Sequence, residues 1–218
     1  MKHPDAQDFL RMFTALGREF SAILTITLSP SLGQAFRRAQ EAAENYSGPA
    51  SIQIIDSHTT AVGLGWIIQC AAKAAADGDS IHKIEHLVRA TIPSVYTLFC
   101  IPGLTYLAEA GYLSPAQAII GEMMGLLPIY SIEDDHLTPM EKVRTHRHLL
   151  EAFQEFIDEF TAPHHVAIVR GHDQNLRTSP LREYMEAAFP CTPFSEHPMG
   201  KYLAAILGPQ SVGLIIIE

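Results

Sequence analysis

The stretch GLTYLAEAGYLSPAQAIIGEMMGLLPIYSIEDDHLTPMEKVRTHR, residues 103–147, contains the features that decide the fold. Leu104 and Leu107 lie at helical spacing, and Gly111 suits the left-handed cap that ends a helix. The Ser-Pro pair at residues 114–115 is typical of the start of another helix. The stretch therefore predicts two short helices in succession.

The second of these helices combines small residues with large flexible ones. Alanine and glycine let a neighbouring surface approach closely, and the methionine thioether fills irregular apolar space. The large apolar side chains of the segment are Ile119, Ile120, Met123, Met124 and Leu127. This composition favours an adaptable apolar slot.

A hairpin is predicted after the helices. Residues 129–132 have the composition of a strand, residues 133–135 that of a turn, and residues 137–140 that of the return strand. The charged residues 141–144 are expected at the start of a further helix.

The order and spacing of these pieces resemble the DegV family, bacterial fatty-acid-binding proteins that present an acyl chain to a fatty acid kinase. The family has a helix ending in Gly-Gly-Arg-Ile-Ser, an Ala-rich helix, a Lys-Pro-Ile strand and, after an acidic turn, Glu-Lys-Val-Arg. The corresponding pieces here are residues 110–114, 116–125, 127–129 and 141–144. Tyr112 stands in place of the family's arginine.

Composition indicates a globular protein and excludes several classes of partner. The chain has 218 residues, of which 47% are hydrophobic and 18% charged, which argues against disorder. Its net charge of -9, without a lysine or arginine block, gives no footprint for nucleic acid. Cys70, Cys100 and Cys191 are widely spaced in apolar surroundings and favour reduced thiols over disulfides or a metal site.

The N-terminal residues lack the apolar core of a signal peptide. The most apolar run, residues 61–76, contains Gln69 and Lys73 and is shorter than the roughly 20 apolar residues that span a bilayer. We therefore expect a cytoplasmic protein without a transmembrane segment.

A strand, a turn and a helix are predicted in succession near the N-terminus, at residues 22–28, 29–33 and 34–46. Hydroxyls and backbone N–H groups at such a turn favour an anionic group such as a carboxylate. Ser29 or Ser31 as an ordinary helix N-cap is the alternative interpretation.

The resemblance extends to this turn and to the next one. The family loop that holds the fatty-acid carboxylate, Ser-Ser-Gly-Leu-Ser-Gly-Thr-Tyr, corresponds to residues 29–36, where Pro30 replaces the second serine. The family's Asp-Ser before a Gly-x-Gly helix corresponds to Asp56 and Ser57, with Gly63 and Gly65. The resemblance implies a head-group site near the domain interface. Its residues would be Ser29, Ser31, Ser57 and His58.

Two features differ from the family near the ends of the chain. The family's Gly-Ala-His-Thr-Gly-Pro-Gly corresponds to residues 204–210, where Ile206 replaces the histidine and Leu207 the threonine. Family members also carry an additional N-terminal strand and helix. We therefore expect a shortened member with an altered head-group site.

His82, Glu85 and His86 have the H-x-x-E-H spacing of inverted zinc proteases. All three also fit the polar face of an amphipathic helix predicted at residues 80–90. Because a further ligand cannot be assigned, the solvated face is the preferred interpretation and zinc the alternative.

These observations predict an α/β protein with DegV-like two-domain architecture. Residues 1–92 are expected to form a shortened Rossmann-like unit, and residues 93–218 an α+β unit with a mixed sheet. The resemblance implies a non-catalytic fatty-acid-binding protein with an acyl tunnel in the second domain. The tunnel residues would be Leu104, Leu107, Ile119, Ile120, Met123, Met124, Leu127, Ile129 and Ile206.

No cofactor is expected besides the bound fatty acid. Lys142, Arg144 and Arg147 are expected to face a partner kinase or an acyl phosphate, with a solvated helix start as the alternative. A second hypothesis is a structural or adaptor protein that has lost its ligand and uses an apolar groove or a sheet edge in a homo-oligomer or a larger assembly.

Overall fold

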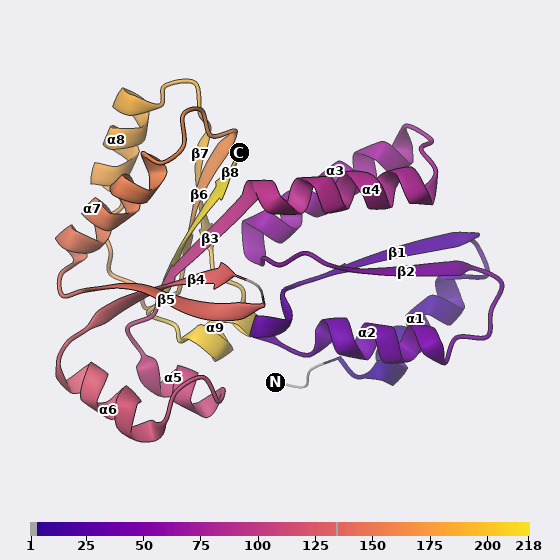
Figure 1. Ribbon diagram of the computed structural model, residues 1–218, viewed down its shortest axis with the longest axis horizontal. Coiled ribbons are helices and arrows are strands. Elements are labelled where there is room, and N and C mark those ends of the chain that lie inside the picture. Colours follow the sequence, from indigo (N-terminus) through magenta and orange to yellow (C-terminus); the bar gives the residue numbers. More distant parts are fainter. Residues whose placement is uncertain (1–3, 134) are drawn as a thin grey trace. The chain divides into compact units, whose positions relative to one another are not determined.

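A computed structural model describes residues 4–133 and 135–218 (Figure 1). The first unit contains the residues up to Thr60 together with Leu64–Ser94, and the second contains Ala61–Gly63 together with Val95–Glu218. None of the described helices is long and apolar enough to cross a membrane.

The first unit is built on two parallel strands, β1 (Ala22–Thr27) and β2 (Ser51–Asp56), paired from Ala22 opposite Ser51 to Thr27 opposite Asp56. Two helices lie along each face of this pair (Figure 1). They are α1 (Ala6–Leu16) and α2 (Ala35–Glu44) on one face, and α3 (Ala61–Ala76) and α4 (Ile81–Thr91) on the other.

Local sequence explains these elements. A capping box between Asp5 and Asp8 starts α1, and Ser80 caps α4 by accepting a hydrogen bond from the Lys83 N–H. Phe13 of α1 is fully buried against Ile23 of β1 and the alanines of α2, which let the two helices approach the sheet closely.

The second unit contains a six-stranded sheet in the order β5-β4-β3-β8-β6-β7. Within the described residues, β6 and β7 pair in parallel and the other neighbours pair antiparallel. Its strands are β3 (Val95–Cys100), β4 (Leu127–Glu133), β5 (His136–Val143), β6 (His165–Arg170), β7 (Phe194–Pro198) and β8 (Val212–Ile217). Every residue of β8 is buried, as expected for a central strand.

Two helices, α7 (His146–Ile157) and α8 (Ser179–Ala188), cover one face of this sheet (Figure 1). Leu149, Phe153 and Ile157 of α7 share one core with alternate residues of the central strands. The predicted helical pair is α5 (Leu104–Glu109) and α6 (Pro115–Met123), and α9 (Lys201–Leu207) contacts α5.

The structure corrects one predicted element and adds two. Residues 141–143 continue β5 instead of opening a helix, and α7 begins only at His146, after Thr145 as its N-cap. Strand β7 and helix α9 were not expected from the sequence. Asp134, in the predicted turn, lies outside the described residues.

Candidate ligand-binding site

Hydroxyl side chains gather at the carboxyl ends of β1 and β2 in the first unit. They are almost completely buried, from 0% exposed for Ser29 and Ser57 to 7% for Thr60. The members of this hydroxyl cluster are Thr27, Ser29, Ser31, Ser57, Thr59 and Thr60. Because a buried hydroxyl without a hydrogen bond costs free energy, the cluster is suited to binding polar groups.

Ser29 and Ser31 are the hydroxyl pair of the predicted head-group turn. Their Oγ atoms lie 2.8 Å apart, and the Ser31 N–H donates to the Ser29 Oγ over 3.3 Å. The pair carries two hydroxyl protons, of which one lies between the two oxygens. The other proton can be donated to a carboxylate oxygen.

The loop after β2 is tied to this turn through the Thr59 carbonyl. It accepts the Ser29 N–H over 2.9 Å and the Ser57 hydroxyl over 3.2 Å. The Thr59 N–H in turn donates to the Ser57 Oγ over 3.3 Å. Ser57 therefore supports the position of Ser29 as well as adding a polar atom to the cluster.

The turn differs from the predicted strand-turn-helix unit. Ser29 caps a single 3-10 turn, Pro30–Leu32, and α2 begins at Ala35 after Gln34, which makes no side-chain capping bond. Neither predicted serine caps α2. Pro30 supplies no N–H, so the donors at this turn are hydroxyls more than backbone amides.

Thr27 was not singled out from the sequence. Its Oγ1 has no hydrogen-bond partner within the part of the chain that the structure describes, although the residue is only 6% exposed. An unsatisfied buried hydroxyl costs about 1–3 kcal/mol. The available signal was the polar Thr at the end of a β-branched strand, followed at once by the serine turn.

His58 extends from the same loop and is held by Asp56. The His58 N–H donates to Asp56 Oδ1 over 2.9 Å, and His58 Nδ1 lies 3.4 Å from Asp56 Oδ2. Asp56 is buried, whereas the His58 side chain is about half exposed, at 48%. Asp56 thus holds an imidazole that is partly exposed to solvent. The His58 backbone lies in the left-handed region, with φ 52°.

In the second unit, the predicted tunnel residues fall into two groups. Leu104, Leu107 and Ile129 are buried, while Leu127 and Ile206 are partly buried. The large side chains of α6 are instead exposed, from 51% to 83%, and so do not lie in a buried tunnel as expected. They are Ile119, Ile120, Met123 and Met124.

The orientation of α6 has a steric cause. Its buried residues are the small ones, Ala118 and Gly121. A Cβ at Gly121 would lie 2.4 Å from the Leu104 Cδ1, so the glycine permits close packing of α6 on α5. The small residues were correctly expected to allow close approach, and they turn the large ones outward.

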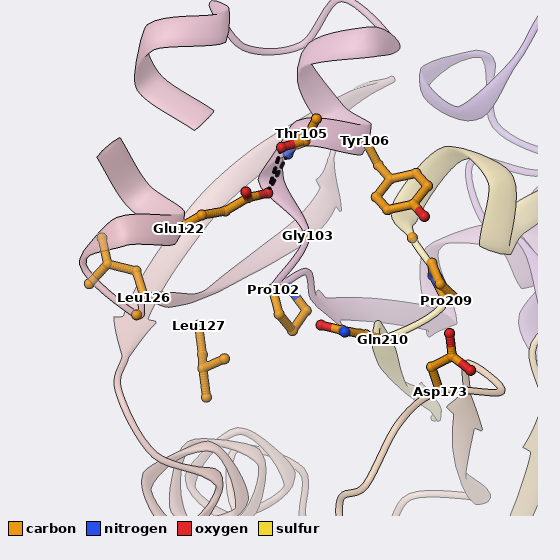
Figure 2. A pocket seen from close by; sticks show the side chains of 12 residues that line it. Pro102, Gly103, Thr105, Tyr106, Glu122, Leu126, Leu127, Asp173, Pro209 and Gln210 are labelled. Atoms are coloured by element: carbon orange, nitrogen blue, oxygen red, sulfur yellow. Dashed lines mark hydrogen bonds between the residues drawn. The ribbon is translucent and has the colours of Figure 1, made fainter. Parts of the chain in front are cut away.

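A cavity of about 590 Å³ opens beside these helices (Figure 2). Glu122 accepts the Thr105 N–H over 2.7 Å and its hydroxyl over 2.8 Å, and Asp173 lies on the opposite wall. Tyr106 covers Gly208, where a Cβ would lie 2.8 Å from the ring. The carboxylates of Glu122 and Asp173 would repel an anionic head group in this cavity. The hydroxyl cluster contains no such charge among its members.

The remaining candidates are exposed charged residues. Lys142 lies in β5, Arg144 follows it, and Arg147 in α7 pairs with Glu151 over 2.8 Å. Of the zinc-like triplet, His82 and His86 are exposed on α4. Its third member, Glu85, accepts hydrogen bonds from Arg89 over 3.1 and 3.0 Å, in keeping with a solvated helix face.

The chain matches known proteins over nearly its whole length. The family model described as "Uncharacterised protein, DegV family" matches residues 2–218. Protein DegV of Bacillus subtilis is 24% identical over 219 residues, covering 97% of this chain and 76% of that protein. A DegV domain-containing protein of Mycobacterium tuberculosis is 27% identical, covering 89% and 69%.

Solved structures share the fold. DegV of Bacillus subtilis, described as a fatty acid binding protein, superposes with a TM-score of 0.84 at 22% identity, covering all 100% of this chain and 78% of that one. The Streptococcus pneumoniae Fatty Acid Kinase (Fak) B3 protein, loaded with linoleic acid, gives 0.83 at 16% identity, covering 98% and 76%. The predicted mixed α/β fold is confirmed, and the chain belongs to the DegV family.

Proposed function

We propose that the chain binds a long-chain fatty acid without converting it chemically, and that the hydroxyl cluster holds the carboxylate. The observation that carries this proposal is the Ser29–Ser31 pair, two buried hydroxyls that share one hydrogen bond and retain a second proton for an acceptor. The solved relatives described as fatty acid binding or loaded with linoleic acid support this ligand class.

Apolar side chains of the second unit are proposed to contact the acyl chain. Leu126 and Leu127, which line the cavity beside α5, supply such surface. Burial contributes about 0.8 kcal/mol per methylene, so a long chain binds tightly through its hydrocarbon alone. Hydrogen bonds from the hydroxyl cluster then orient the carboxylate, even though Tyr112 and Ile206 replace polar residues of the family pattern.

The chain is proposed to act as a carrier for a partner kinase rather than as an enzyme. A relative named for a fatty acid kinase supports such a partner. Lys142 and Arg144 are exposed cations that suit an acyl phosphate or an acidic partner surface. Arg147 is less available for this role, because Glu151 neutralises part of its charge.

Native mass spectrometry of the purified chain tests the ligand class. The expected result is one added mass per chain that is released on denaturation and identified as a fatty acid. A protein that remains empty after incubation with oleate would overturn the proposal. A parallel incubation with the corresponding alcohol tests the carboxylate, since the hydroxyl cluster should favour the anion.

An adaptor function is the second candidate, favoured by the exposed apolar face of α6. Met123 on that face is 83% exposed, and contiguous exposed apolar side chains mark interaction surfaces. Light scattering coupled to size-exclusion chromatography distinguishes the two candidates. A lipid-loaded monomer supports the carrier, and an empty oligomer supports the adaptor.

A further inference from the structure

Two imidazole rings meet at one hydroxyl in the sheet of the second unit. The His165 Nε2 lies 2.7 Å from the Ser195 Oγ, and the His197 Nε2 lies 2.9 Å from the same oxygen. His165 is the first residue of β6, and Ser195 and His197 belong to β7. We call these three residues the His-Ser-His cluster.

The parallel register of β6 and β7 brings the three side chains to one face of the sheet. Ser195 is opposite Ala167, and His197 is opposite Val169. Because side chains alternate along a strand, both share a face with His165, which comes two residues before Ala167. The opposite face of β6 packs against α7 and α8 (Figure 1). The cluster therefore lies on the face that these two helices leave uncovered.

The side chains around the cluster on this face are apolar. Those from β6 and its neighbour β8 are Ala167, Val169, Ile215 and Ile217. Glu196 stands between Ser195 and His197 in β7, but it points to the other face, where it accepts a hydrogen bond from Arg182 of α8. Strands β6, β7 and β8, as described, thus bring imidazole nitrogens and a hydroxyl to this face, and no carboxylate.

We propose that the His-Ser-His cluster binds a divalent transition-metal ion such as Zn²⁺, Ni²⁺ or Cu²⁺ through the Nε2 atoms of His165 and His197. Imidazole nitrogen is a preferred ligand of these ions, whereas Mg²⁺ and Ca²⁺ prefer oxygen ligands. Zinc–nitrogen bonds are about 2.0–2.1 Å long. The two nitrogens already converge on one point from 2.7 and 2.9 Å, and the exposed His197 can move closer. Water completes the coordination.

The protons of the cluster define what the ion must displace. Ser195 has one hydroxyl proton, so it donates to one imidazole and accepts the Nε2–H of the other. A metal ion needs the lone pairs of both Nε2 atoms, which the rings offer when each carries its proton on Nδ1. Metal bonds then replace both hydrogen bonds to Ser195. The hydroxyl therefore competes with the ion for the imidazoles and is not required as a ligand.

Isothermal titration calorimetry of the full chain, without an affinity tag, tests this proposal independently of fatty acid binding. The probe is zinc chloride at neutral pH, and the expected result is one zinc ion per chain. His165→Gln and His197→Gln should each weaken zinc binding by about tenfold or more, since even the loss of a group that only orients a metal ligand costs that much. Magnesium chloride should give no heat of binding at the same concentrations.

Two further substitutions identify the ligands. Every protein in the series carries His86→Gln, because His82 and His86 are exposed one turn apart on α4 and could bind zinc themselves. Ser195→Ala is the matched control, since it breaks the same hydrogen bonds as the histidine variants but keeps both imidazoles. Its zinc affinity should be no lower than that of the chain with Ser195. Circular dichroism verifies that the metal-free variants fold.

Three outcomes overturn the proposal. One is the absence of binding heat at millimolar zinc in the chain that carries His86→Gln alone. Another is unchanged affinity in both His165→Gln and His197→Gln, which would assign the ion to other ligands. The third is a loss in Ser195→Ala equal to that in the histidine variants, because zinc binding would then depend on the hydrogen-bonded strand pair and not on the imidazoles.

Discussion

The Oγ atoms of Ser29 and Ser31 lie 2.8 Å apart across Pro30, and both side chains are buried. No charged group among the described residues is in hydrogen-bond contact with either hydroxyl. The pair therefore forms a small polar site that favours an acceptor such as a carboxylate oxygen. Pro30 fixes the backbone between them and thereby limits how far the two oxygens can separate.

Ser31→Ala is expected to weaken oleate binding by about ten- to hundredfold, because a hydrogen bond to a charged group contributes about 1.5–3 kcal/mol. Isothermal titration calorimetry measures the change. Ser80→Ala removes a serine that caps α4 far along the chain and should leave the affinity unchanged. Equal losses in both variants would indicate a general effect on folding instead of a head-group contact.

Glu196→Gln is expected to destabilise the second unit at neutral pH by about 1–3 kcal/mol. The carboxylate accepts a hydrogen bond from Thr178 over 2.8 Å and from Arg182 over 2.6 Å, and Arg170 lies 3.6 Å away. Burial alone would raise the pKa of Glu196, but these hydrogen bonds and the two arginine charges lower it below its usual value.

The sign of the pH dependence follows from this lowered pKa. The stabilisation is present above the unfolded pKa of glutamate, about 4.3, and is lost as the pH falls through the lower folded value. The free energy of unfolding, measured with urea, should therefore be higher for wild type than for Glu196→Gln at neutral pH. This difference should disappear in acid. Glu183→Gln, exposed on α8, is the matched control and should show no such difference.

Much of the fold follows from local sequence. Residues 95–100 combine β-branched, aromatic and other apolar side chains, and residues 214–217 are apolar and mostly β-branched; both lie in central strands. Ser114 was expected to start a helix and forms a full capping box with Gln117. In these segments the local preference and the tertiary environment agree, so periodicity was sufficient.

Other features depend on distant partners. Strand β7 contains Glu196, His197 and Pro198, which do not indicate a strand, and it forms because β6 offers an edge in parallel register. The helical periodicity of α6 did not reveal which face packs, because the contact is decided by Leu104 against Gly121. Similarly, the buried hydroxyl of Thr27 depends on the packing around the end of β1.

The three cysteines are expected to react at different rates with a thiol reagent at about pH 8. Cys191 is exposed and should react first, and Cys70 is partly buried, which raises its thiol pKa and slows the reaction. Burial raises the pKa of the Cys100 thiol to about 12, so it should react only after unfolding. Cys191→Ser should remove the fast phase alone; a persistent fast phase would assign it to another thiol.

Gly171→Ala is expected to lower the melting temperature of the chain through a destabilisation of about 1–3 kcal/mol. A Cβ at Gly171 would lie 2.0 Å from the Pro209 carbonyl oxygen, which is backbone and cannot rotate away as a side chain would. That carbonyl also accepts the Asp173 N–H over 3.0 Å, and the Gly171 N–H donates to the Ser211 carbonyl over 2.8 Å. The added methyl group must therefore separate the two loops that these hydrogen bonds join.

Gly200→Ala is the matched control, because a Cβ there meets no atom within 4 Å and the residue's φ of -63° suits alanine. Differential scanning calorimetry should show a lower melting temperature for Gly171→Ala and an unchanged melting temperature for Gly200→Ala. Pro209 and Asp173 also line the cavity beside α5, so a ligand of that cavity should bind Gly171→Ala more weakly. An unchanged melting temperature for Gly171→Ala would show that the two loops separate at little cost, and that their close approach does not contribute to stability.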